Sequence, residues 1–155
     1  MRFILIDKVI SIEPGRQIKT IKNVSLAEEY LADHFPAFPV LPGVLLLQGL
    51  IESASWLVRK TQNFSNSMIL LQQVKNVKYK SFLAPGDQIE YTIDAKDIEE
   101  NISSFTGSGT ANGEKIVEAR LALRHFNLAD ENSAFAKTDA KVNESMKKRW
   151  ELLKS

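Results

Sequence analysis

Residues 34–47 read His-Phe-Pro-Ala-Phe-Pro-Val-Leu-Pro-Gly-Val-Leu-Leu-Leu, a histidine followed by a proline-rich loop and then an apolar run. The prolines interrupt any regular structure up to the last of them, Pro42. Pro42 itself suits the first turn of a helix, where a missing N–H costs nothing. Because no proline follows for many residues, we expect a helix from Gly43 to about Lys60. Apolar residues fall on all of its faces, which predicts a buried helix.

The sequence on both sides of this helix has the composition and the period of β-strands. A capping box at Ser25 and Glu28 predicts one short helix, over Leu26–Ala32. The turns, such as Asn112-Gly113, are too short for crossover helices and therefore indicate antiparallel neighbours. The predicted strands are Phe3–Ile12, Gln17–Val24, Met68–Phe82, Gln88–Ile98, Ile102–Ala111 and Lys115–Leu123. The predicted fold class is α+β, a curved antiparallel sheet wrapped around one central buried helix.

The end of the chain has a different character. Val142, Met146, Trp150 and Leu153 recur at helical spacing, which predicts an extra C-terminal amphipathic helix over about Asp139–Leu153, after a loop. We expect this helix to dock on the body of the protein or on a partner subunit, and a membrane-surface or acidic-partner helix is the alternative. The predicted organisation is one domain, residues 1–126, followed by a loop-and-helix extension, residues 127–155.

The composition excludes several classes of protein. The chain has 155 residues, a formal net charge of +1, two histidines and no cysteine. Without cysteine there is no disulfide framework, thiol nucleophile or thiolate metal site, and near-neutral charge argues against a nucleic-acid partner. No apolar run reaches the roughly 18 residues of a membrane span, and Met1–Phe3 shows no signal-peptide pattern. We therefore predict a cytoplasmic protein with no membrane span, no metal and no cofactor.

The loop and the helix start bring two chemical groups together. The prolines fix the path of the loop and so the direction of the His34 imidazole. Gly43 lets a ligand approach the backbone closely, and its N–H is one of the unpaired donors at a helix N-terminus. A base beside such a donor suits removal of a proton next to a carbonyl group. On the residues alone, a structural histidine in a turn beside a buried helix is the alternative.

The same segment resembles the signature of the beta-hydroxyacyl-acyl-carrier-protein dehydratases, the FabA/FabZ type with the hotdog fold. His34-Phe35-Pro36, Pro39 and Pro42-Gly43-Val44-Leu45 match its spacing, and Pro85-Gly86-Asp87-Gln88 is similar to the family's Pro-Gly-Asp-Gln turn. The resemblance covers about residues 5–123. It implies an enzyme of fatty-acid or related lipid biosynthesis that dehydrates (3R)-hydroxyacyl thioesters of acyl carrier protein or CoA. It also implies a homodimer, with a trimer of dimers as the larger assembly.

The resemblance assigns roles residue by residue. His34 matches the catalytic histidine that removes the C2 proton, and Gly43 matches the glycine whose backbone N–H binds the thioester carbonyl. Phe35, Pro42 and Val44 complete the expected substrate-binding set. His125, the second histidine of the chain, follows the last strand and is predicted to lie at the surface or in an interface.

One position departs from the family. Gln48 stands where these enzymes have their catalytic acid, whereas Glu52, one helical turn on, stands where they commonly have glutamine. We expect Glu52 to supply the missing acid, through Gln48 or a water molecule. Two alternatives stay open: a hotdog acyl thioesterase, in which Gln48 and Glu52 hold the attacking water, and a non-catalytic acyl-thioester-binding or partner subunit.

Overall fold

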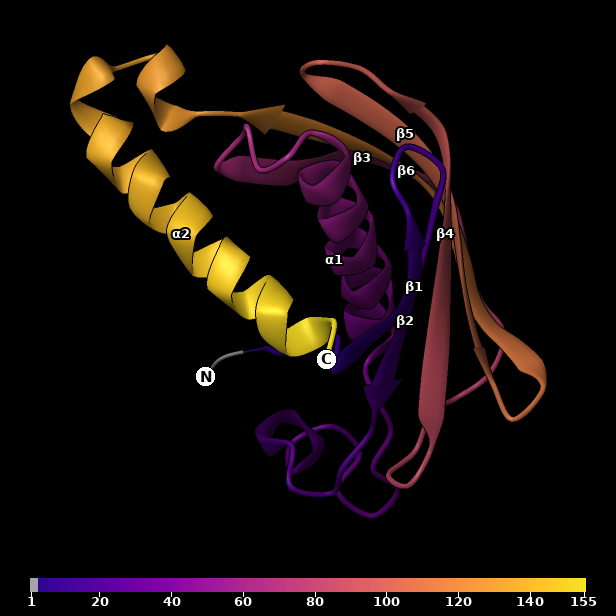
Figure 1. Cartoon of the computed structure of the whole chain (residues 1–155). Coiled ribbons are helices and arrows are strands. Elements are labelled where there is room, and N and C mark those ends of the chain that lie inside the picture. The colour runs from indigo at the N-terminus through magenta and orange to yellow at the C-terminus, as the bar shows by residue number, and fades with distance from the viewer. Residues whose placement is uncertain (1–2) are drawn as a thin grey trace.

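A computed structural model describes residues 3–155 and confirms the curved antiparallel sheet around a central helix, with a further helix at the C-terminus (Figure 1). Met1 and Arg2, the beginning of the segment without a signal-peptide pattern, lie outside the described residues. The elements are β1 (Lys8–Glu13), β2 (Gln17–Asn23), α1 (Gly43–Thr61), β3 (Met68–Tyr79), β4 (Gln88–Ile98), β5 (Ile102–Ala111), β6 (Glu114–Phe126) and α2 (Ala136–Leu153).

The six strands form one sheet in the order β1-β2-β4-β5-β6-β3, and every neighbouring pair is antiparallel. Strands β2, β4, β5 and β6 alternate between buried and less buried residues, as a sheet with one covered face requires. Their buried side chains form the core against α1 and include Ile18, Ile93, Phe105 and Leu121. Strand β3 lies at one edge and pairs only with β6.

Helix α1 runs along the concave side of the sheet, and it begins at Gly43 as predicted. The prediction that it is buried all round is wrong for its first half, where the Val44 side chain is 70% exposed and Gln48 is also exposed. A single-layer sheet covers only one side of a helix. On that side Gly49 lies directly against the Tyr91 ring of β4, so closely that a Cβ atom at position 49 would overlap the ring.

The short helix predicted over Leu26–Ala32 is wrong. The segment forms a turn and a single 3-10 turn, Glu29–Leu31. Ser25 Oγ accepts a hydrogen bond from the Ala27 N–H at 3.2 Å, but the Glu28 carboxylate does not close a capping box. It binds the buried Lys22 ammonium at 2.7 Å instead. An ion pair with a strand residue has therefore overridden the local helix signal.

Helix α2 packs on the side of α1 that faces away from the sheet, which confirms docking on the body of the protein (Figure 1). The Trp56 and Trp150 rings meet at 5.9 Å. Near its start, Asp139 accepts hydrogen bonds from the N–H groups of Leu128 (3.0 Å) and Ala129 (2.9 Å) and from the Ser67 hydroxyl. Among residues 3–155 no helix has the length and apolar character needed to cross a membrane, and the cytoplasmic location stays a prediction.

We expect Gly49→Ala to destabilise the protein by about 1–3 kcal/mol, because the new methyl group would overpack the core against Tyr91. The direction of this change in stability is informative, because alanine within a helix is intrinsically more favourable than glycine by about 1 kcal/mol. Urea unfolding measures the free energy. Ser55→Ala on the same helix is the control and should change it by no more than about 0.5 kcal/mol. An unchanged or increased stability for Gly49→Ala would contradict the close approach.

Candidate functional site

The loop before α1 holds the His34 ring in one orientation. His34 Nδ1 lies 2.8 Å from the carbonyl oxygen of Val40, and because a carbonyl only accepts hydrogen bonds, Nδ1 carries the hydrogen. Nε2 therefore has the free lone pair of a base. Phe35 has a positive φ of 52°, and its carbonyl accepts from the Phe38 N–H at 2.7 Å, which closes the turn between them. The half-buried imidazole is thus oriented by the backbone of its own loop.

The first turn of α1 presents its N–H donors next to this loop. The N–H groups of Leu45 and Leu46 bond to the Pro42 carbonyl at 2.9 and 3.3 Å, whereas the N–H of Gly43 has no carbonyl within the helix to bond to. A Cβ atom on Gly43 would lie 3.3 Å from the Tyr79 ring, which packs across the helix start. Burial raises the pKa of Tyr79. Tyr79 lies at the end of β3, and sequence reasoning did not single it out.

Apolar side chains surround this region without being buried. Phe35, Phe38, Val44 and Phe82 are each exposed, and the rings of Phe38 and Phe82 meet edge to face at 6.2 Å. Large apolar side chains gathered on one surface are characteristic of binding sites and interfaces. This surface therefore has the properties of a place where a ligand or a second chain binds.

A second set of predicted residues lies further along α1, in a cavity of about 250 Å³ between α1, α2 and the N-terminal segment. The structure brings Gln48 and Glu52 together here. The lining residues are Phe3, Gln48, Ile51, Glu52, Ser55, Trp56, Arg59, Ile69, Met146 and Arg149. The predicted residues at positions 34, 35 and 42–44 do not line it, so within one chain the candidate site consists of two separate parts.

Glu52 has a charged partner that the sequence did not reveal. Arg149 Nη2 on α2 lies 3.1 Å from Glu52 Oε1. Burial raises the pKa of Glu52 above its ordinary value. The nearby charges of Arg149 and Lys22 and the Leu5 N–H oppose that shift, while Asp7 adds to it. A buried carboxyl group with a raised pKa can carry a proton closer to neutral pH than a free one.

Two further buried groups, Arg59 and His125, are not part of the ion pair between Glu52 and Arg149. Arg59 is buried and donates to the carbonyl oxygens of Asn66 and Ser67, both at 3.1 Å, and burial lowers its pKa to about 10. The prediction that His125 lies at the surface or in an interface is wrong, since its side chain is fully buried. Its ring is 3.0 Å from Ser103 Oγ and 2.9 Å from the Glu100 carbonyl, and burial lowers its pKa. These contacts make His125 a structural, neutral histidine.

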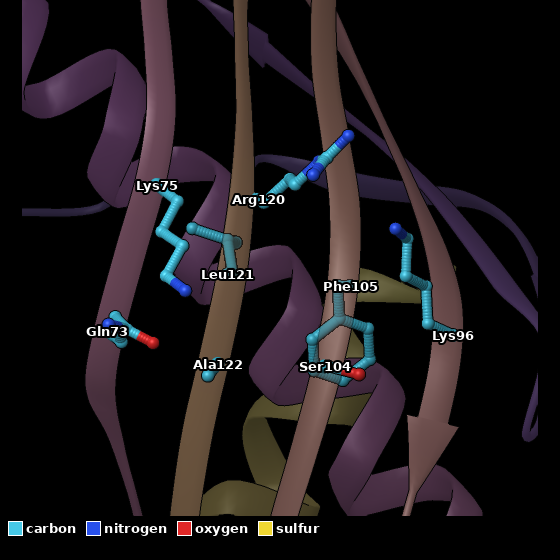
Figure 2. Close-up of a pocket in the computed structure, with 8 residues that line it drawn as sticks. All are labelled: Gln73, Lys75, Lys96, Ser104, Phe105, Arg120, Leu121 and Ala122. Atoms are coloured by element: carbon cyan, nitrogen blue, oxygen red, sulfur yellow. The ribbon is translucent and has the colours of Figure 1, made fainter.

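A hollow on the outer face of the sheet lies apart from both parts of the candidate site. Figure 2 shows Lys75, Lys96 and Arg120 around it, on β3, β4 and β6, with the small side chains Ser104 and Ala122 at its centre. Within residues 3–155, no carboxylate forms an ion pair with these three cations. The hollow is cationic and holds none of the predicted site residues.

The sequence resemblance predicts the FabA/FabZ family, and comparison with known proteins confirms that family. The family model described as the FabA-like domain matches residues 1–120. The chain belongs to the FabA-like family. Among curated relatives, the 3-hydroxyacyl-acyl-carrier-protein dehydratase FabZ of Actinobacillus succinogenes is 36% identical over 120 residues, 77% of this chain and 80% of that protein. FabZ of Wolbachia pipientis is 30% identical over 120 residues, 77% of this chain and 84% of that protein.

Solved structures confirm the hotdog fold. The dehydratase heterocomplex ApeI:P from Xenorhabdus doucetiae superimposes with a TM-score of 0.70 at 17% identity, covering 86% of this chain and 90% of that one. Zebrafish thioesterase superfamily member 2 gives a TM-score of 0.58 at 16% identity, covering 76% and 79% of the two chains. The FabA-like match ends at residue 120, so α2 and its Arg149 lie beyond it.

The raised pKa of Glu52 predicts a pH-dependent stability. A carboxyl group whose folded-state pKa exceeds its unfolded value contributes stability below the unfolded pKa, and this contribution is lost as pH rises through the folded pKa. Glu52→Gln is neutral at every pH. We therefore expect its melting temperature, relative to that of the wild-type protein, to increase as the pH rises from about 4 through the raised pKa of Glu52.

Glu144→Gln provides a control of opposite sign, because the hydrogen bond and charge of Lys148 lower the pKa of Glu144. Its melting temperature relative to wild type should fall slightly as pH rises. A Glu52→Gln difference that is flat with pH would show that Glu52 is not desolvated in the folded protein.

Proposed function

We propose that this protein is a 3-hydroxyacyl-thioester dehydratase acting on acyl-carrier-protein thioesters, or on CoA thioesters, in fatty-acid or related lipid biosynthesis. The observation that carries the proposal is the state of His34. Its Nδ1–H is held by the Val40 carbonyl at 2.8 Å, so that the lone pair of Nε2 is free to act as a base. Membership of the FabA-like family and the named activity of the FabZ relatives support the same reaction.

In the proposed reaction, His34 Nε2 removes a proton from C2 of the substrate. The Gly43 N–H donates a hydrogen bond to the thioester oxygen and stabilises the negative charge that develops there. The C3–O bond then breaks, and the leaving hydroxyl takes up a proton and departs as water. The product is the trans-2-enoyl thioester, and the reverse reaction hydrates it. No redox step is involved.

The proton for the leaving hydroxyl comes from Glu52 in this proposal. Along α1, Glu52 lies about 6 Å beyond Gln48 at 1.5 Å per residue. Gln48 occupies the position of the family acid, but an amide is not a general acid. Helical side chains lean toward the N-terminus, so Glu52 can lean toward Gln48, and a water held by the amide completes the path to the substrate. The raised pKa of Glu52 suits this role.

The proposal includes a homodimer, in which His34 of one protomer meets Gln48 and Glu52 of the partner subunit. The two parts of the candidate site are separate within one chain, which a shared site would explain. Strand β3 supports the same arrangement, because it is a 12-residue edge strand with Leu70 and Leu71 exposed. A long apolar edge normally pairs with another chain. A trimer of dimers is the larger assembly to test for.

We expect Leu70→Lys combined with Leu71→Lys to shift the protein from dimer to monomer, because charges along the edge disfavour strand pairing. Light scattering after size exclusion measures the mass. Ile102→Lys is the matched control, because Ile102 on β5 is 39% exposed, like Leu71, but does not lie on the edge strand. A double variant that keeps the mass and activity of the wild-type dimer would exclude β3 as the interface.

We expect His34→Ala to reduce kcat for hydration of an enoyl thioester by about 10²–10⁴-fold, the usual contribution of a general base. Glu52→Gln should cause a loss in the same range if Glu52 is the acid. Gln48→Glu, which restores an acid at the family position, should retain or increase the rate. His125→Asn is the control, expected to leave the rate of the folded fraction near wild type because His125 is buried away from the site.

The products separate this proposal from the other two. Interconversion of hydroxyacyl and enoyl thioesters supports the dehydratase. Release of free thiol would identify a thioesterase, and binding of the thioester without turnover would identify a non-catalytic acyl-binding subunit. The test includes the non-catalytic subunit because Gln48 replaces the family acid.

A further inference from the structure

We propose that Arg149 on helix α2 is a positioning residue for Glu52, so that the C-terminal helix forms part of the reaction site. This inference rests on the proposed function, because it concerns the carboxyl group that supplies the proton there. It assigns a role to a segment that lies outside the family match, which ends at residue 120.

The contact is a direct ion pair across a long stretch of chain. Arg149 Nη2 and Glu52 Oε1 lie 3.1 Å apart and are separated by 97 residues in sequence. Both side chains are largely removed from water, with 23% of Arg149 and 19% of Glu52 exposed. A pair this far from solvent is screened much less than a surface pair, and removing one partner leaves the other charge uncompensated.

Arg149 belongs to a helix that is fixed in place. Trp150, the next residue, packs against Trp56 of α1, and Met146, one turn earlier, lines the same cavity as Gln48 and Glu52. The start of α2 is anchored through Asp139 to the Ser67 hydroxyl and to two backbone N–H groups. Helix α2 is thus anchored near both of its ends, and it holds the Arg149 guanidinium beside Glu52. Arg149 therefore differs from a mobile surface arginine.

The other charged groups near Glu52 do not replace Arg149. From β2, Lys22 acts on Glu52 at longer range and is already paired with Glu28 at 2.7 Å and with Asp7 at 3.5 Å. Asp7, before β1, opposes ionisation of Glu52, and the Leu5 N–H favours it. On α1, Arg59 lines the same cavity, but its guanidinium donates to the carbonyl oxygens of Asn66 and Ser67, both at 3.1 Å. From β4, the buried Tyr91 hydroxyl has a pKa that the charge of Glu52 helps to raise, and it has no hydrogen-bond partner within the part of the chain that the structure describes.

Arg149 is thus the cation that contacts Glu52 directly. It has two effects on the carboxyl group: it fixes the side-chain rotamer on the cavity side, and it lowers a pKa that burial raises. Without it, the carboxyl group would keep its proton to higher pH but would no longer be held in position. Loss of position lowers the rate, and the retained proton moves the pH profile, so the two effects can be measured separately.

The test compares Arg149→Gln with Arg149→Lys and with the control Lys148→Gln. Lys148 is the neighbouring residue of α2, but it is exposed and pairs with Glu144 on the helix surface. In hydration of an enoyl thioester by the full-length protein, we expect Arg149→Gln to lower kcat by about 10²-fold, the cost of misplacing a reacting group by about 1 Å, with little change in KM. Arg149→Lys, which keeps the charge, should recover part of the loss, and Lys148→Gln should match wild type.

The pH profile is the readout that a merely structural role would not move. If protonated Glu52 is the acid, the high-pH limb of kcat should shift to higher pH in Arg149→Gln. Carboxyl NMR of Glu52 should show the same upward shift of its pKa without any turnover. Trp150 fluorescence and thermal unfolding check that α2 remains docked in each variant.

The outcomes separate the inference from the proposed function. An inactive wild-type protein overturns the proposed function. The NMR titration then tests only whether Arg149 shifts the pKa of Glu52. An active wild-type protein whose Arg149→Gln variant keeps both kcat and the pH profile overturns the inference only. A Glu52 pKa that is the same in wild type and in Arg149→Gln overturns it in either case.

Discussion

The structure depends on one geometric constraint: a sheet of a single layer can cover only one side of a helix that is apolar over most of its surface. The six strands curve around α1 and bury its inner face against residues such as Ile93 and Phe105. The outer face is left for other elements to cover. Helix α2 covers part of it through the contact between Trp56 and Trp150, and the first turns of α1 stay exposed, where Val44 and Gln48 lie. The cavity between α1 and α2 follows from this incomplete coverage.

The predictions that held were those governed by local rules. The six strands were predicted from their composition and period, although β1 begins at Lys8 and not at Phe3, and a proline at the first turn predicted that α1 begins at Gly43. The predictions that failed concerned residues whose partners are distant in the chain. Glu28 binds Lys22 instead of capping a helix, and His125 is buried between Ser103 and the Glu100 carbonyl. A local sequence pattern gives no information about these distant partners.

The residues of the candidate site also differ in whether their partners are local or distant in the chain. His34 and Gly43 could be predicted because the chemistry of each depends on neighbours within a few residues, and the Val40 carbonyl that orients His34 is one of them. Glu52 could be named from its position on the helix, but its environment could not. Its pKa is set by burial beneath α2 and by Arg149, Lys22 and Asp7, which lie in three other segments. Tyr79 was missed for the same reason, since only the fold brings it to the start of α1.

Strand β6 determines how far the chain can be shortened from its C-terminus. Its pairing continues beyond the end of the family match at residue 120 on both sides, to Arg124 with β5 and to Phe126 with β3. The residues after 120 hold the first half of β3 in the sheet, from Met68 to Val74. A shortened protein that ended at the limit of recognisable similarity would therefore lose half of the attachment of an edge strand. The additional part of the chain therefore belongs to the sheet itself, which the family match includes only in part.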